Sequence, residues 1–270
     1  MNIRGNWSPS KYTIKSGAIL ASRNAKEVSP SSLLITQLIA NCYQYSIPIH
    51  AKGDLLDLGC GKAPLHALYA SYVKSAVWAD WGNSLHENQN LDIECDLSER
   101  LPFADEKFDT IILSDVLEHI AKPDYLWTEM NRILKQGGKV IMNVPFLYWI
   151  HEQPFDYFRY TEFALRRFAE QSGFSIHELK PVGGSLDVLV DILAKHLCVT
   201  PVIGRWMARL TCSAGILFAR TPFWKKVSMR TGKNFPLGYF LIAEKHHPFD
   251  YNHEHTLQPA QLALSEEGKK

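Results

Sequence analysis

The loop His151–Thr161 concentrates side chains that could move a proton or hold a polar ligand. An imidazole or a carboxylate placed against a reacting hydroxyl can act as a general base, which accelerates such a reaction about 10²–10⁴-fold. We therefore expect His151 and Asp156 to be catalytic. His119 is a second candidate base, although it could equally be a residue at the start of a helix.

The same loop carries side chains suited to binding a substrate. Tyr157, Arg159 and Tyr160 offer aromatic surface, hydroxyl groups and a guanidinium, and we expect them to form a substrate wall. One alternative stays open. Asp156 and Arg159 are three residues apart and can form a local ion pair that only shapes the loop. No constellation of metal ligands stands out in the sequence, so no metal is predicted.

A second informative segment is Asp57-Leu58-Gly59-Cys60-Gly61, which ends an apolar run. Glycines at a strand end let the backbone turn sharply and approach a ligand closely. Open α/β sheets bind ligands beyond the carboxyl ends of their parallel strands, where this turn would lie. A nicotinamide dinucleotide is the competing ligand, but its fingerprint needs a small residue where this chain has Pro64. A pyrophosphate site is therefore disfavoured.

Further polar residues follow the next apolar runs. Asp80 ends the run Ala76–Ala79, and a carboxylate there can accept hydrogen bonds from both hydroxyls of a ribose. Trp81 beside it could lie against an adenine face. Asp96-Leu97 and Ser114-Asp115 come after later runs. All of these groups would meet at one edge of a parallel sheet.

That sheet is visible in the pattern of the chain. From Leu55 onward, apolar runs alternate with helical patterns, which is typical of βα units whose sheet is covered on both faces. One helix is expected from Pro123 through Leu134, ending at Gly137-Gly138. Another, opened by Ser29-Pro30, precedes the first strand and could lie over a ligand at the sheet edge. Strands are expected at 54–58, 75–79, 91–95, 110–114, 139–144, 175–180 and 238–244.

The ordered motifs resemble those of class I S-adenosylmethionine-dependent methyltransferases, especially the methyltransferase type 11-like branch that acts on small molecules, lipids and glycans. The resemblance covers roughly residues 55–173, and Ala63 departs from it where many members have a third glycine. It implies an α/β, Rossmann-like, seven-stranded, mostly parallel sheet with an antiparallel last strand and helices on both faces. The motifs are Asp57-x-Gly59-x-Gly61, Asp80, Asp96-Leu97, Leu101-Pro102-Phe103, Phe108-Asp109 and Arg132–Gly138.

The resemblance also implies S-adenosylmethionine as cofactor and a role for each motif residue. Asp57 and Asp96 could instead be a turn-capping acid and a loop residue, and Cys60 a small apolar filler. The implied cofactor contacts are Asp57, Gly59, Cys60 and Gly61 at the methionine part, Asp80 and Trp81 at the ribose and adenine, Asp96 and Leu97 at the adenine amino group, and Ser114 and Asp115 near the sulfonium.

The acceptor is indicated by a weaker resemblance. The pattern His-x-x-Pro-x-Asp-x-x-Arg-Tyr-Thr from His151 resembles one in methyltransferases encoded with polysaccharide and lipid-linked glycan pathways. It favours methyl transfer to a small-molecule or glycan acceptor, at oxygen. Carbon methylation of a quinone-like or lipid ring is an alternative, as is a catalytically silent cofactor-binding module.

The composition of the chain indicates its cellular compartment and the kinds of partner that it can bind. The net charge of +1 is too small to indicate nucleic-acid binding by the protein surface as a whole. Five cysteines without a CxxC pair argue against disulfides and structural zinc and favour a reducing cytoplasm. The sequence has no stretch of 18 or more apolar residues, so no transmembrane helix is predicted.

Residues 186–235 break the βα rhythm. They carry eight Lys and Arg against two acids, with several large aromatic side chains. We expect an insertion that packs on the domain as a lid, contacts an anionic membrane from the cytoplasmic side, or forms an oligomer interface. The expected organisation is an N-terminal helical cap (1–50), the core (51–185 and 236–246), this insertion (186–235) and a polar tail (247–270).

Overall fold

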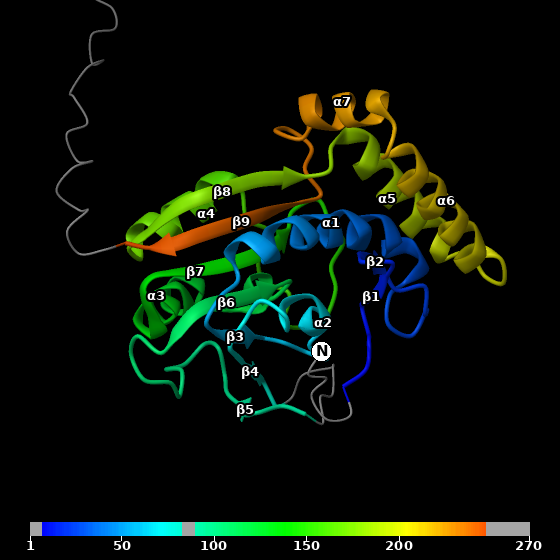
Figure 1. The fold of residues 1–270 in the computed structure, drawn as a ribbon. Helices are drawn as coiled ribbons and strands as arrows, with labels where there is room; N and C mark the ends of the chain where they lie inside the picture. The colour runs from blue at the N-terminus through cyan, green and yellow to red at the C-terminus, as the bar shows by residue number, and fades with distance from the viewer. Residues whose placement is uncertain (1–6, 83–89, 247–270) are drawn as a thin grey trace, which may run out of the picture.

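A seven-stranded sheet forms the centre of the computed structural model, which describes residues 7–82 and 90–246 (Figure 1). Its strand order is β5-β4-β3-β6-β7-β9-β8. Within this sheet, β9 runs antiparallel to β7 and β8 and the other pairs are parallel, which confirms the predicted fold class. The strands are β3 (Asp54–Leu58), β4 (Ser75–Asp80), β5 (Ile93–Glu94), β6 (Phe108–Ser114), β7 (Leu134–Pro145), β8 (Phe174–Val182) and β9 (Gly238–Lys245).

Helices cover both faces of the sheet. Successive residues of a strand point to opposite faces. Leu55 accordingly belongs to the core under α1 and α2, and Leu56 to the core under α3 and α4. Both side chains are fully buried, which explains why the central strands are continuous apolar runs. The helices are α1 (Leu33–His50), which follows the 3₁₀ turn η1 (Pro30–Ser32), α2 (His66–Tyr69), α3 (Pro123–Ile133) and α4 (Glu162–Gln171).

The first 50 residues are not purely helical, contrary to the predicted cap. A hairpin of β1 (Tyr12–Lys15) and β2 (Ala18–Ala21) precedes α1 and turns at Gly17, whose φ is +78°. The predicted helix is present, but it lies on the sheet face. The hydroxyl of Tyr43 in α1 donates to the side-chain carbonyl of Asn143 in β7 at 2.7 Å.

The boundary between α3 and β7 also differs from the prediction. The helix ends at Ile133, and Leu134 already pairs with Phe108 in the sheet. The amides of Glu106 and Lys107 donate to the last helical carbonyls, at 3.0 and 2.8 Å, so the chain can leave the helix before it reaches Gly137.

The expected insertion consists of α5 (Ser185–Cys198), α6 (Gly204–Phe218) and α7 (Pro222–Thr231). The first two helices pack against η1 and α1, and α7 buries none of its residues (Figure 1). Within the described ranges, no helix combines the length and apolar character needed to cross a membrane. The predicted tail, 247–270, lies outside the described residues.

Candidate active site

The loop after β3 has a conformation that suits glycine. Gly59 and Gly61 have φ angles of +67° and +48°. A Cβ atom on Gly59 would lie 2.6 Å from a methyl group of Val116. The Gly59 amide donates to the Ala79 carbonyl of β4 at 2.8 Å. The loop is thus held against the strand ends, with its backbone open to the cavity on the other side.

Two carboxylates at successive strand ends face the same cavity. Asp80 ends β4 and accepts hydrogen bonds from the amides of Gly61 (2.6 Å) and Trp81 (2.7 Å). Asp96 follows β5 and accepts one from the Ser98 amide at 2.8 Å. Backbone donors therefore orient both groups at the cavity wall.

The cavity has a volume of about 370 Å³, within the range typical of small-molecule sites. It lies beyond the carboxyl ends of β3, β4 and β6, where α/β sheets bind ligands. Its charged lining is mostly acidic, which favours a ligand that carries positive charge. The charged residues are Glu27, Asp80, Asp96, Asp115 and Glu152 against Lys11 and Lys62.

The end of β6 forms the next part of the wall. Asp115 has a φ of +54° and forms an ion pair with Lys11 at 2.5 Å. Asn143 of β7 donates to the other oxygen of Asp115 at 2.5 Å and accepts from the Ser114 hydroxyl at 2.9 Å. This network fixes Ser114 and Asp115 at the cavity.

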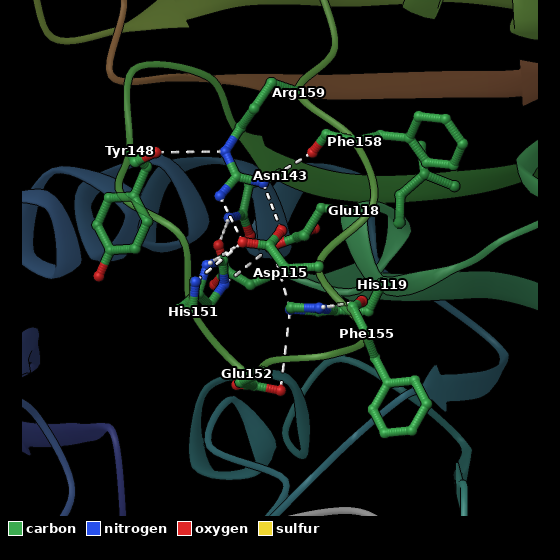
Figure 2. A network of polar contacts seen from close by, with 12 residues as sticks. Asp115, Glu118, His119, Asn143, Tyr148, His151, Glu152, Phe155, Phe158 and Arg159 are labelled. Carbon is green, nitrogen blue, oxygen red and sulfur yellow. Dashed lines mark hydrogen bonds and ion pairs between the residues drawn. The ribbon is translucent and has the colours of Figure 1, made fainter.

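Hydrogen bonds from neighbouring residues fix the position of the Asp156 carboxylate (Figure 2). Both its oxygens accept hydrogen bonds from Arg159, at 2.5 and 2.7 Å, and the His151 amide donates to it at 2.9 Å. Burial alone would raise the pKa of Asp156, but the hydrogen bonds from Arg159 and His151 outweigh it and hold the pKa at about 2. A carboxylate of such low basicity shapes the loop and is a poor proton acceptor.

Two imidazoles lie side by side, His119 at the cavity wall and His151 behind it (Figure 2). The rings of His119 and His151 are 4.8 Å apart, edge to face. His119 lies in the 3₁₀ turn η2 (Leu117–His119), and its Nδ1 is 3.0 Å from the Phe155 carbonyl oxygen. Burial and the neighbouring His119 lower the pKa of His151. Glu118, fully buried behind both rings, has its pKa raised well above the usual value by burial and by Asp115.

Comparisons with known proteins agree with this architecture. A family model described as a methyltransferase domain (Methyltransf_11) matches residues 56–142, which run from the glycine loop to β7. Residues 56–142 thus match a methyltransferase domain of the class I S-adenosylmethionine-dependent type. S-adenosylmethionine is the cofactor typical of this family.

Individual relatives match the methyltransferase domain over part of their length. A ubiquinone biosynthesis O-methyltransferase of Cereibacter sphaeroides is 33% identical over 119 residues, which cover 40% of this chain and 48% of that protein. An uncharacterized methyltransferase of Mycobacterium tuberculosis is 46% identical over 43 residues, 16% of this chain and 17% of that one. The chain thus spans about half the length of the Cereibacter relative and a smaller part of the Mycobacterium relative.

A solved structure supports the fold. The S-adenosylmethionine-dependent methyltransferase from Archaeoglobus fulgidus aligns with a TM-score of 0.50 at 15% identity and covers 76% of this chain and 92% of that one.

The cavity of the methyltransferase domain unites most of the residues predicted from the motifs. The predicted residues that line it are Gly59, Cys60, Gly61, Asp80, Trp81, Asp96, Leu97, Ser114, Asp115, His119 and Tyr157. His151, Asp156, Arg159 and Tyr160 belong to the layer behind this wall.

Asp57 is the predicted cofactor residue that does not reach the cavity. Its side chain is buried on the α2 side of the sheet, where the Tyr69 hydroxyl donates to it at 3.1 Å. Burial raises the pKa of Asp57 to about 7. The prediction that it borders the methionine part is wrong for this structure, because strand alternation turns Asp57 away and places it beneath the loop.

Two predicted substrate contacts have structural roles instead. Tyr160 is buried, and its hydroxyl donates to the Leu117 carbonyl at 3.0 Å. Arg159 is occupied by Asp156 and also donates to the Trp149 carbonyl at 3.0 Å. The local ion pair left open by the sequence is therefore present. Tyr157 remains at the cavity.

The N-terminal segment contributes residues that no motif indicated. Lys11 reaches Asp115, and the Trp7 indole donates to the Ala63 carbonyl at 3.0 Å. Glu27 accepts from Lys62 in the glycine loop at 3.0 Å. The part of the domain that closes over the loop is thus the chain around the hairpin, since none of the residues lining the cavity comes from α1.

Proposed function

We propose that this protein transfers a methyl group from S-adenosylmethionine to an oxygen of a small-molecule or glycan acceptor. The observation that carries the proposal is a single cavity in which the glycine loop, Asp80 and Asp96 are continuous with Ser114, Asp115 and His119. A cofactor held by the first set would end at the second. The C. sphaeroides relative, an O-methyltransferase by name, supports oxygen as the accepting atom.

The residues fit this cofactor. A carboxylate at Asp80 would hold the ribose hydroxyls, Asp96 the adenine amino group, and Asp115 would lie near the cationic sulfonium. The cofactor supplies a methyl group on a good leaving group. The protein's main contribution is then alignment of the acceptor, which can lower the barrier by about 7–11 kcal/mol. A general base would add about 10²–10⁴-fold, and His119, whose ring lines the cavity, would take this role once an acceptor displaces the contact of Nδ1 with the Phe155 carbonyl.

A turnover assay tests the proposal. The wild-type protein is incubated with cofactor labelled in the methyl group and with extracts that contain glycans, lipids and quinones. The extracts are then fractionated, and the label should appear in the fraction that contains the acceptor. Mass spectrometry then identifies the atom methylated and separates oxygen from carbon methylation. Tight cofactor binding without transfer to any fraction would favour the catalytically silent module.

The insertion suggests where the acceptor is met. Large apolar side chains stand exposed on α5–α7, among them Trp206 (65% exposed) and Phe223 (72%). Soluble monomeric proteins rarely expose a large contiguous patch of apolar side chains. The same helices carry an excess of basic side chains, and basic helices with Trp and Phe bind anionic lipid surfaces. We infer that α5–α7 dock on an anionic membrane, which fits a lipid-linked acceptor and a peripheral place on its cytoplasmic face.

A liposome experiment tests the membrane contact. Replacing Arg205, Arg209, Lys225 and Lys226 by glutamine should weaken binding to anionic vesicles on the order of 1,000-fold, since each basic residue near the surface contributes about 1 kcal/mol. The matched control replaces four exposed lysines away from these helices and should sediment like wild type. Unchanged sedimentation of the first variant would contradict the proposal. The control positions are Lys15, Lys52, Lys74 and Lys107.

A further inference from the structure

Three side chains that commonly ligate metals converge where His119 lines the cavity, the other two lying behind it (Figure 2). They are Glu118, His119 and His151, and one ligand atom of each lies within 4.8 Å of the others. Oε1 of Glu118 is 3.8 Å from Nε2 of His119 and 3.8 Å from Nε2 of His151. Because Glu118 and His119 are adjacent and His151 is far along the chain, the sequence gives no metal-binding spacing.

The carboxylate oxygens of Glu118 receive no hydrogen bond from the residues that the structure describes. Glu118 is fully buried, and neither of its oxygens accepts a hydrogen bond from another residue within 7–82 or 90–246. Nε2 of His119, which faces it, is also buried without a hydrogen bond in those ranges. A buried polar group left in this state costs about 1–3 kcal/mol. A cation between the carboxylate and the imidazoles would remove that cost for all of them.

One of the two imidazoles, His119, is already held as metal ligands usually are. A ligating histidine donates its other ring nitrogen to a carbonyl or carboxylate, which fixes the ring and its tautomer. Nδ1 of His119 is 3.0 Å from the Phe155 carbonyl oxygen, and Nε2 of the same ring is 3.8 Å from Glu118. Nδ1 of His151 is 3.3 Å from Asp156 without forming a hydrogen bond to any described residue, and its Nε2 is 3.8 Å from Glu118. Asp156, held by Arg159, lies behind His151.

We propose that Glu118, His119 and His151 bind one divalent transition-metal ion, such as Zn²⁺ or Mn²⁺. Two imidazole nitrogens and one carboxylate oxygen suit these ions and leave coordination positions open. Bonds of about 2.0–2.2 Å need only small side-chain shifts from the present separations. Oε2 of Glu152 lies 3.8 Å from Nε2 of His119 on the cavity side and could add a further ligand.

The open positions would face the acceptor. His119 and Glu152 line the cavity, so an acceptor oxygen could enter the coordination shell. A bound cation would orient such an oxygen and lower the pKa of its hydroxyl group, whose proton would pass to solvent water before methyl transfer. This use of the ion rests on the proposed methyl transfer, whereas the metal site does not. With the ion present, His119 and His151 act as ligands and not as general bases.

Metal titration tests the site directly. The full chain is stripped with a chelator and titrated with Zn²⁺ against a chromophoric competitor, and we expect one tight equivalent. Glu118→Gln and His151→Asn each remove a ligand and should therefore weaken Zn²⁺ binding by more than the roughly 10–100-fold that loss of an outer-shell partner costs. His177→Asn is the matched control, because His177 is exposed and pairs with Glu244 at 2.8 Å on another part of the sheet. A variant with asparagine at His247, His253 and His255 controls for binding by the tail.

Several results would overturn the site. These are no tight Zn²⁺ equivalent in the wild type, full affinity in Glu118→Gln and His151→Asn, or loss of binding only in the tail variant. Cofactor titration of the same variants checks their folding, since the cofactor contacts are separate from the three ligands. Intact Zn²⁺ binding in a wild type that does not bind S-adenosylmethionine would refute the proposed function and leave the metal site standing.

Discussion

Replacing Asp80 by alanine should weaken binding of S-adenosylmethionine and S-adenosylhomocysteine by at least about 100-fold. A hydrogen bond to a charged group contributes about 1.5–3 kcal/mol, and the carboxylate would accept two from the ribose hydroxyls. The same substitution removes the acceptor for the Gly61 amide at 2.6 Å, so the loop loses an anchor as well. Isothermal titration of both ligands measures the effect.

Two variants make this result specific. Asp80→Asn keeps one carbonyl oxygen for the Gly61 amide, so its loss of affinity should be smaller than that of alanine. Asp124→Ala removes an exposed carboxylate at the start of α3 and should bind the cofactor like wild type. Undiminished binding by Asp80→Ala, or no binding by the wild type, would refute the cofactor site.

Replacing Gly59 by alanine should destabilise the fold by roughly 2–5 kcal/mol and abolish cofactor binding at ordinary concentrations. The left-handed backbone costs a non-glycine residue about 1–2 kcal/mol. Overpacking against Val116, whose methyl would be 2.6 Å from the new carbon, adds about 1–3 kcal/mol. Urea unfolding and cofactor titration measure the two consequences.

Gly17 offers the matched control for backbone strain. Its φ is +78°, and a Cβ there would meet no atom within 4 Å. Gly17→Ala should therefore cost only the strain, about 1–2 kcal/mol, and keep cofactor affinity. Adding Val116→Ala to Gly59→Ala should recover part of the loss, because it removes the colliding methyls. Equal destabilisation by both single variants would show that the contact with Val116 is unimportant.

The sequence predicted those parts of the site that depend on local patterns. Gly59, Gly61 and Asp80 each follow an apolar strand, so alternation of strands and helices was enough to place them at one sheet edge. Lys11 could not be found in this way. Its partner Asp115 lies 104 residues along the chain, and no local pattern predicts the pairing of this half-buried lysine with one particular strand end.

The sequence-based predictions were wrong where a residue could lie on either of two faces of a strand, or could belong to either a helix or a strand. Asp57 has the residue type of a cofactor contact, but its position in the strand directs it toward Tyr69. Tyr160 has a polar hydroxyl that suggested substrate binding, yet a backbone carbonyl satisfies it in the core. Leu134 continued the apolar helical face, although its pairing with Phe108 begins the strand. Tertiary contacts decided each case, and a single sequence does not contain them explicitly.

The strand order has a consequence for how the chain is assembled during synthesis. β8 lies at the sheet edge and pairs with β9, which is made only after the three helices of the insertion. Until Lys245 has emerged, β7 and β8 both present unpaired backbone groups, which are templates for association with other chains. A ribosome-bound chain must therefore keep two open strand edges apart while about 55 further residues are added. α5, which directly follows β8, packs on α1 together with α6, so the end of β8 is anchored to the rest of the fold by contacts that do not involve β9.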